Sequence, residues 1–409
     1  MSAPARVGQR AALVTGIGVA APNGLGARAW WAAVLRGESG IGPLTRFDAD
    51  GYPVRVAGEI RGFVDEDHVP GRLRPATDRV TRLTLAVAAE ALADAEVDPT
   101  LLTGSNAGVI MASSAGGLEF GQHELQALWS QGRRHVSVYH ASAWFPAAGC
   151  GQLSVRHKTH GPGGAVVTEQ AGGLDAVAQA RRQLRGGTAL MLAGGVDSAL
   201  CPWAWAAHLA AGSLSTVAEP DSAYRPFAPD ACGHVLGEGG ALMVLESAET
   251  ARARGAAGYG TIAGYAATFD GPALPRLRAA ADLALADAGV SPGDIDVVFA
   301  DAAGERDADR AEAEAITALF GPYAVPVTAP KSMTGRLLAG GSTLDLAAAL
   351  FSLRDQVVPP TTATERTAQD CPLDLVIGEP RRGGVLRCAL VLARGRGGFN
   401  SAVVVRGPG

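Results

Sequence analysis

The strongest constraint on the fold is an alternation of short apolar runs with longer alanine-rich amphipathic segments, which the chain passes through twice. Continuous apolar runs are typical of strands covered on both faces, and amphipathic segments of about ten residues or more are typical of helices. In the first round the sequence predicts strands at 12–15, 107–112, 165–167, 189–192 and 241–245, and helices at 27–35, 79–95, 119–130 and 172–184. Such alternation indicates an α/β protein.

The second round begins after residue 255. It predicts strands at 261–265, 296–300, 387–392 and 401–406, and helices at 275–288, 311–320 and 342–355. The stretches 237–246 and 397–406 have similar patterns, because each runs from a glycine turn into an apolar strand. Such a repeat is expected if one structural unit is duplicated. No low-complexity linker separates the rounds, so we expect an N-terminal half (1–255) and a C-terminal half (256–409) that share one core.

Composition and charge exclude several classes of protein. Of the 409 residues, 47% are hydrophobic and 18% are charged, which excludes an intrinsically disordered chain. A net charge of −5 leaves no basic footprint for nucleic acid or an anionic membrane. No apolar run approaches the roughly 20 residues of a membrane span, and residues 1–10 carry no secretory signal. Five cysteines without a CxxC pair favour a reducing compartment, so we expect a cytoplasmic protein.

Short catalytic and cofactor motifs fit poorly. Residues 16–21 satisfy the relaxed dinucleotide pattern GxGxxA in an expected glycine-rich turn, but Pro22, Asn23 and Gly24 interrupt the segment before a helix can begin. A nicotinamide-dependent oxidoreductase is therefore a weakly supported alternative. The chain contains no GxSxG, Walker A or HExxH motif, and its eight histidines do not fall at metal-ligand spacings, so we expect neither cofactor nor metal.

Six segments together carry a resemblance to a known family. They are 166–176 (VVTEQAGGLDA), 299–301 with Asp309 and Glu312, 330–336 (PKSMTGR), 225–227 (RPF), 237–239 (GEG) and 398–401 (GFNS). Over nearly its whole length the chain resembles the β-ketoacyl synthases. The resemblance implies an α/β thiolase fold with duplicated βαβ halves in a layered αβαβα arrangement.

The chemistry of that family explains why departures from its motifs matter. Claisen condensation needs a thiolate, which a cysteine gains at a helix N-terminus, and two histidines that assist decarboxylation and stabilise the enolate and oxyanion. By the resemblance, Gln170 stands at the cysteine position, and Asp301 and Arg336 stand at the histidine positions. Lys331, one of only two lysines in the chain, and Glu312 are retained. A carboxamide offers no usable nucleophile, so we expect no catalytic residue and no condensing activity from the chain alone.

The combination is similar to the chain length factor, the ketosynthase β subunit of bacterial type II polyketide synthases. Both the 169–175 segment (EQAGGLD) and the terminal 394–401 segment (RGRGGFNS) carry this similarity. It implies a heterodimer with an active ketosynthase α subunit, an acyl carrier protein that bears the growing polyketide, and a chain-holding tunnel at the interface. It also implies a set of tunnel residues: Leu118, Gly121, Leu125 and Trp203.

The first three of these tunnel residues share one face of a predicted helix, a spacing that an ordinary core helix has as well. Gly121 removes a side chain from the middle of that row. We therefore expect a longer tunnel than a phenylalanine-rich row would leave, and a medium to long poly-β-ketone product.

Two further readings of the degenerate positions stay open. Gln170 alone permits a malonyl decarboxylase that supplies an acetyl primer, but this reaction needs the two histidines, and a carboxylate at position 301 would repel the enolate. A self-sufficient condensing enzyme would need three substitutions reversed. We also expect Lys331 to pair with an acidic group such as Glu312, and Arg336 to pair with Asp301 within about 4 Å and fill the former site.

Overall fold

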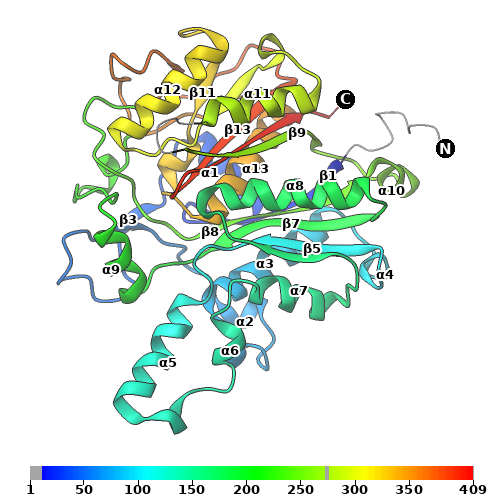
Figure 1. Cartoon of the computed structure of the whole chain (residues 1–409), viewed down its shortest axis with the longest axis vertical. Helices are drawn as coiled ribbons and strands as arrows, with labels where there is room; N and C mark the ends of the chain where they lie inside the picture. The colour runs from blue at the N-terminus through cyan, green and yellow to red at the C-terminus, as the bar shows by residue number, and fades with distance from the viewer. Residues whose placement is uncertain (1–11, 272–275, 409) are drawn as a thin grey trace.

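The chain folds around a twelve-stranded mixed sheet (Figure 1). This computed structural model describes residues 12–271 and 276–408, so the polar segment 1–10 and the predicted helix start at residue 275 lie outside the described residues. The first-half strands are β1 (Ala12–Ala21), β2 (Gly24–Leu25), β5 (Ala107–Ala112), β6 (Gly163–Val166), β7 (Leu190–Asp197) and β8 (Gly239–Ser247). The second-half strands are β9 (Gly260–Phe269), β10 (Val297–Phe299), β11 (Pro326–Thr328), β12 (Asp374–Leu375), β13 (Cys388–Gly395) and β14 (Phe399–Arg406). A separate pair consists of β3 (Ile41–Pro43) and β4 (Val56–Gly58).

The two halves of the sheet repeat one topology. The first half has the order β1-β8-β7-β5-β6 and the second has the order β9-β14-β13-β10-β11, and β1 pairs with β9 where the halves meet. In each half the second strand is antiparallel to both neighbours, while the last three strands are parallel. This repeat confirms the expected duplicated halves.

The helices form three layers, one between the two halves of the sheet and one on the outer side of each half. The central layer consists of α8 (Gly172–Arg185) and α13 (Ala339–Asp355), which contact strands of both halves. The outer helices are α3 (Arg79–Asp94) and α7 (Ala148–His157) on the first half, and α11 (Leu277–Ala288) with α12 (Arg306–Phe320) on the second (Figure 1). The other helices are α1 (Ala27–Leu35), α2 (Asp65–His68), α4 (Pro99–Leu102), α5 (Leu118–Gln131), α6 (His140–Ala143), α9 (Pro202–Ala210) and α10 (Ala248–Ala253). The αβαβα layering is as expected, and within 12–271 and 276–408 no helix could cross a bilayer.

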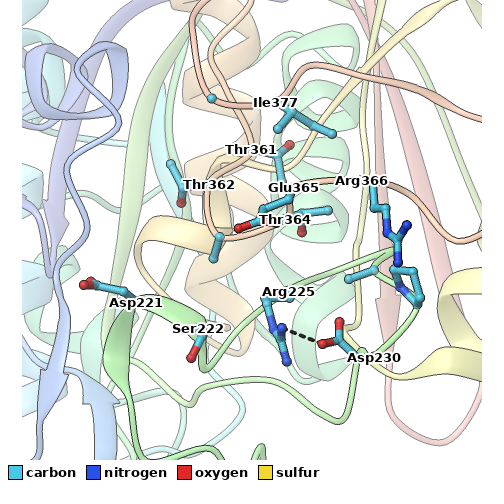
Figure 2. Close-up of a pocket in the computed structure, with 14 residues that line it drawn as sticks. Asp221, Ser222, Arg225, Asp230, Thr361, Thr362, Thr364, Glu365, Arg366 and Ile377 are labelled. Carbon is cyan, nitrogen blue, oxygen red and sulfur yellow. Dashed lines mark ion pairs between the residues drawn. The ribbon is translucent and has the colours of Figure 1, made fainter.

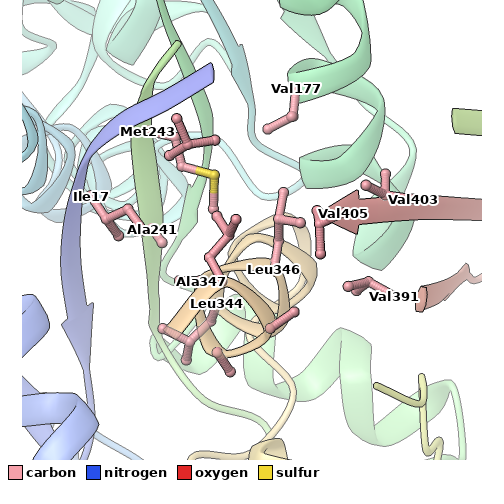
Figure 3. Close-up of a cluster of buried hydrophobic side chains, with 14 of the residues drawn as sticks. Ile17, Val177, Ala241, Met243, Leu344, Leu346, Ala347, Val391, Val403 and Val405 are labelled. Atoms are coloured by element: carbon pink, nitrogen blue, oxygen red, sulfur yellow. The ribbon is translucent and has the colours of Figure 1, made fainter. Parts of the chain in front are cut away.

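The main core lies around α13, which is buried from Ala339 to Leu353 (Figure 3). A helix that is apolar on all sides requires covering on all sides. The first half covers α13 through Ile17, Ala241 and Met243, and the second half covers it through Val391, Val403 and Val405. The two halves therefore share one core.

The glycine-rich turn predicted after residue 15 is wrong, because β1 continues through these glycines to Ala21. A Cβ on Gly16 would lie 2.2 Å from the Ala91 carbonyl oxygen, and one on Gly18 would lie 2.0 Å from the Val87 carbonyl oxygen. The backbone of α3 thus packs directly on the backbone of β1. Close packing of strand and helix accounts for the glycines of the GxGxxA pattern.

Candidate functional site

Gln170 lies in a short 3-10 turn, η4 (Glu169–Ala171), that leads directly into α8. The chain enters this turn through Glu169, whose φ of +51° is rare for a residue with a side chain. Gln170 is fully buried, and a Cβ on Gly341 would lie only 2.4 Å from its Nε2 atom. Its carboxamide packs against α13, and among the described residues neither of its polar atoms has a hydrogen-bond partner.

Asp301 and Arg336 form a buried ion pair. Arg336 Nη1 lies 3.0 Å from Asp301 Oδ2, and Nη2 lies 3.2 Å from Oδ1. The Arg336 side chain is 7% exposed and the Asp301 side chain is 1% exposed. Burial alone would raise the pKa of Asp301, but the charges of Arg336 and Lys331 hold it below its ordinary value. The expected pairing of these two residues is confirmed.

Lys331 belongs to the same polar cluster and pairs with an acidic group as predicted, but that group is Asp345 and not Glu312. Its Nζ atom lies 2.6 Å from Asp345 Oδ2 and also donates to the Ala300 carbonyl oxygen. Glu312 instead accepts hydrogen bonds of 2.7 Å from the backbone N–H groups of Asp301 and Ala302. Burial and the neighbouring charge of Asp301 raise the pKa of Glu312 to about 7.

Sequence reasoning missed two members of this cluster. Asp345 is the partner of Lys331, and burial raises its pKa to about 6 although Lys331 opposes the shift. The signal for it is a single acid within the apolar run of α13. Burial, followed by the charge of Arg336, holds the pKa of His234 well below its ordinary value, so this imidazole is neutral.

An apolar hollow of about 640 Å³ lies between α5 and α9. Its lining residues carry no charge: Gln122, Leu125, Gln126, Trp129, Ser130 and Trp203. Of the four predicted tunnel residues, Leu125 and Trp203 line this hollow, and Gly121 lies directly beneath the Trp203 ring. Leu118 is not among the lining residues and packs against the cluster around Trp205 instead.

Helices α5 and α6 project from the body of the molecule and carry much exposed apolar surface (Figure 1). We call this surface, together with exposed apolar residues of α7, of the segment after β6 and of α9, the apolar face. Its large exposed side chains are Leu128, Trp129, Val138, Tyr139, Trp144, Phe145, Val155, Val167 and Trp203. A surface of this kind usually marks a protein interface.

Asp78 anchors the projecting helix. Its carboxylate accepts hydrogen bonds from Val80 N at the start of α3, and from Phe120 N in the first turn of α5. Burial raises the pKa of Asp78 to about 6, although these two hydrogen bonds oppose the shift. One buried carboxylate therefore joins the N-terminal ends of both helices.

A different cavity, of about 710 Å³, lies between the segments 221–230 and 361–366 (Figure 2). Five charged side chains line it, among them Arg225 and Asp230, which pair at 2.6 Å. Placing an apolar chain against such walls would desolvate these charges at a cost, so the hollow at α5 suits an apolar chain better. Within the described residues, no group of three or more His, Cys, Asp and Glu side chains is arranged to hold a metal.

Comparison with known proteins places the chain in a family. Residues 9–251 match the N-terminal domain and residues 258–365 match the C-terminal domain of β-ketoacyl synthases. The tetracenomycin polyketide synthase ketoacyl synthase beta subunit of Streptomyces glaucescens is 53% identical over 412 residues, which cover 99% of each chain.

Two solved structures share the fold over nearly the whole chain. The ishigamide ketosynthase/chain length factor has a TM-score of 0.89 at 28% identity, and covers 98% of this chain and 100% of its own. The second is a chain from the complex of a type II PKS acyl-carrier protein with its ketosynthase bound to the hexaketide. It has a TM-score of 0.88 at 26% identity, and the match covers 98% of this chain and 100% of that chain. The chain belongs to the β-ketoacyl synthase family, and within it to the ketosynthase β or chain length factor subunits of type II polyketide synthases.

Proposed function

We propose that this chain is the catalytically inactive subunit of a heterodimeric ketosynthase and sets the length of the polyketide that its active α subunit builds. In this proposal an acyl carrier protein delivers the chain, and the hollow between α5 and α9 forms part of the tunnel that receives it. The structural relatives support these partners, since one is a ketosynthase/chain length factor and another contains an acyl carrier protein and a hexaketide.

The observation that carries the proposal is the contrast between a filled polar site and an open apolar hollow. Gln170 takes the place of a nucleophile in this proposal, and the Arg336–Asp301 pair takes the place of the two histidines. The polar atoms of Arg336 and Asp301 bind one another or backbone groups. The Gln170 carboxamide has no hydrogen-bond partner among the described residues, but an amide is neither a base nor a nucleophile at neutral pH. The hollow shares no residue with this cluster and has the uncharged walls that an apolar chain requires.

The apolar face supports the proposed heterodimer. Trp129 is 78% exposed and Val138 is 88% exposed, which is unfavourable for two large apolar side chains in water. Aromatic residues are enriched in the centres of protein interfaces. Strand β6 ends the sheet beside this face and leaves one edge unpaired within the described chain. An α subunit that covers the face would also close the open side of the hollow.

The charge of the polar cluster disfavours the alternative function of a malonyl decarboxylase. A malonyl thioester would have to enter beside the ionised Asp301, which would repel the enolate that decarboxylation forms.

We also propose that the heterodimer works in the cytoplasm. The five cysteines are all unpaired, as is usual in a reducing compartment.

The test is product length in a reconstituted synthase. The chain is purified with its α subunit, supplied with carrier protein and a malonyl donor, and the product is measured by mass spectrometry. We expect Gly121→Phe to shorten the product by one or more malonyl-derived units, because its ring must displace Trp203 or fill the hollow. Gly121→Ala is the control, since its Cβ would meet Trp144 and Trp203 at ordinary contact distances of 3.6 and 3.7 Å. An unchanged product from an assembled Gly121→Phe heterodimer would refute the proposal.

A further inference from the structure

Gln122 forms a hydrogen bond that joins the two helices of the hollow. Its side-chain Oε1 accepts a 2.7 Å hydrogen bond from the backbone N–H of Trp203. Trp203 lies in the first turn of α9, where backbone N–H groups have no acceptor within the helix. The residue before the helix, Cys201, supplies no side-chain cap. Gln122 therefore caps α9 from a different helix.

The indole of Trp203 is held from the same turn of α5. A Cβ on Gly121 would lie 3.7 Å from Trp203 Cζ3, so the ring lies next to Gly121. On the other side of Gly121 the equivalent distance to Trp144 Cβ is 3.6 Å. Two consecutive residues of α5 thus contact Trp203, one at its ring and the other at its backbone N–H.

The remaining surface of Trp203 faces the hollow. The residue is 48% exposed and lines the hollow together with Leu125. Among the described residues, the Trp203 N–H donates to Gln122, and the Cys201 side chain makes no cap hydrogen bond. A helix start without its cap is less stable, and its first turn can occupy other conformations more often. Loss of the Gln122 hydrogen bond would therefore loosen the position of Trp203 in the wall of the hollow.

We propose that Gln122 is a positioning residue that fixes Trp203 and thereby determines where the tunnel ends. This inference rests on the proposed function, and it names a polar residue outside the row of residues 118, 121 and 125. Gln122 acts through Trp203 and does not need to contact the polyketide.

Product length in the reconstituted heterodimer again provides the test. Gln122→Met keeps the side-chain size but removes the acceptor, and Gln122→Glu keeps an acceptor oxygen at the same distance from the backbone. We expect Gln122→Met to change the ratio of the main product to its neighbours in length by about threefold or more, the lower range for loss of a helix cap. Gln122→Glu should restore the ratio. Gln131→Met is the matched control, because Gln131 is an exposed glutamine at the end of the same helix and is not a lining residue of the hollow.

Coupling to Trp203 separates positioning from a general loss of stability. In a Trp203→Ala background there is no indole to position, so adding Gln122→Met should change the product ratio no further. Additive effects of the two substitutions, or an unchanged ratio in Gln122→Met alone, would overturn the inference. If Gln122→Met does not assemble with its partner, Gln122→Asn, whose amide is too short to reach Trp203, replaces it. If neither Gly121→Phe nor Trp203→Ala alters product length, the proposed function itself fails, whereas a response to these two but not to Gln122→Met refutes the positioning role alone.

Discussion

Substitution of Arg336 by methionine tests whether the polar cluster is structural. Methionine retains an apolar stem of similar length but removes both hydrogen bonds that the Arg336 guanidinium donates to the Asp301 carboxylate. It also removes the 3.0 Å bond from Arg336 Nη2 to the Arg394 carbonyl oxygen. Asp301 would keep only the hydrogen bond from Arg394 N, at 2.9 Å, for a side chain that is 1% exposed. Leaving one partner of a buried ion pair unpaired costs about 3–5 kcal/mol.

Protonation of Asp301 limits this loss and gives it a pH dependence. Starting from an ordinary pKa of about 3.9, neutralising the carboxyl costs about 4 kcal/mol at about pH 7 and about 2 kcal/mol at about pH 5.5. Without Arg336, burial would raise the pKa of Asp301 above its unfolded value, so the folded variant would bind more protons than the unfolded chain. Its free energy of unfolding should therefore rise as the pH falls from about 7 to about 5.5, by about 2 kcal/mol relative to the native chain. In the native chain the pKa of Asp301 is lowered, so the contribution of Asp301 is constant over this range and is lost only under more acidic conditions.

Urea unfolding of the heterodimer at both pH values, followed by tryptophan fluorescence, measures this difference. The matched control is Arg306→Met, which breaks a pair between Arg306 and Asp370 that is 37% and 40% exposed. Exposed pairs contribute at most about 1 kcal/mol, so this control should lose little stability at either pH. The double variant Arg336→Met/Asp301→Asn removes the buried charge and should recover part of the loss. A loss in Arg336→Met no larger than in Arg306→Met, or one that grows toward low pH, would refute the reasoning.

Two further substitutions test the packing and the inactive site. Gly18→Ala places a Cβ 2.0 Å from the Val87 carbonyl oxygen and should destabilise the chain by roughly 1–3 kcal/mol or more, measured as a lower urea midpoint. Gly51→Ala, with no atom within 4 Å of its Cβ, should change the midpoint little, and equal effects would contradict the packing argument. Gln170→Cys should give no condensation product from the chain alone with malonyl-loaded carrier protein, because in the proposed assignment Asp301 and Arg336 stand at the two histidine positions and are bonded to each other. A condensation product would contradict that assignment.

Most of the fold could be predicted because its long elements have a clear apolar pattern. The prediction of α1 matches both ends, whereas β7 and β9 extend several residues beyond the predicted apolar runs. The sequence pattern missed several other elements, among them α7, α9, α10, β11 and β12. The boundary between residues 255 and 256 falls in the connection from α10 to β9 and stays a prediction.

The start of α13 illustrates how tertiary packing can override local preference. The helix was predicted from residue 342 but begins at Ala339, with Gly340 and Gly341 in its first turn. Glycine disfavours a helix by about 1 kcal/mol, so a pair of glycines indicates a turn when only local preference is considered. A Cβ on Gly340 would lie 1.9 Å from the Gly239 carbonyl oxygen. Gly340 permits α13 to pack directly on β8, and Gly341 leaves room for the Gln170 carboxamide. The local sequence pattern does not encode these contacts.

The members of the polar cluster were easier to predict than their partners. Asp301 and Arg336 lie in motifs, and their opposite charges made an ion pair the simplest expectation. Lys331 had several acidic candidates, and the choice between Glu312 and Asp345 depends on how α12 and α13 lie against η7 (Pro330–Met333). Glu312 is already engaged by two backbone N–H groups, which leaves Asp345 for the lysine. Such competition between acceptors depends on tertiary geometry.

The geometry of the hollow changes the size argument for tunnel length. If Gly121 only removed a side chain from the tunnel wall, the tunnel would lengthen by the space of that side chain. In the structure, that space lies between Trp144 and Trp203, whose nearest atoms are 3.6 and 3.7 Å from the Cβ position. A Cβ therefore fits at this position in ordinary contact with both residues, and the backbone N–H of Trp203 is bonded to Gln122. A larger residue at 121 therefore shortens the tunnel partly by moving Trp203, and the effects of residues 121 and 203 on product length should not be additive.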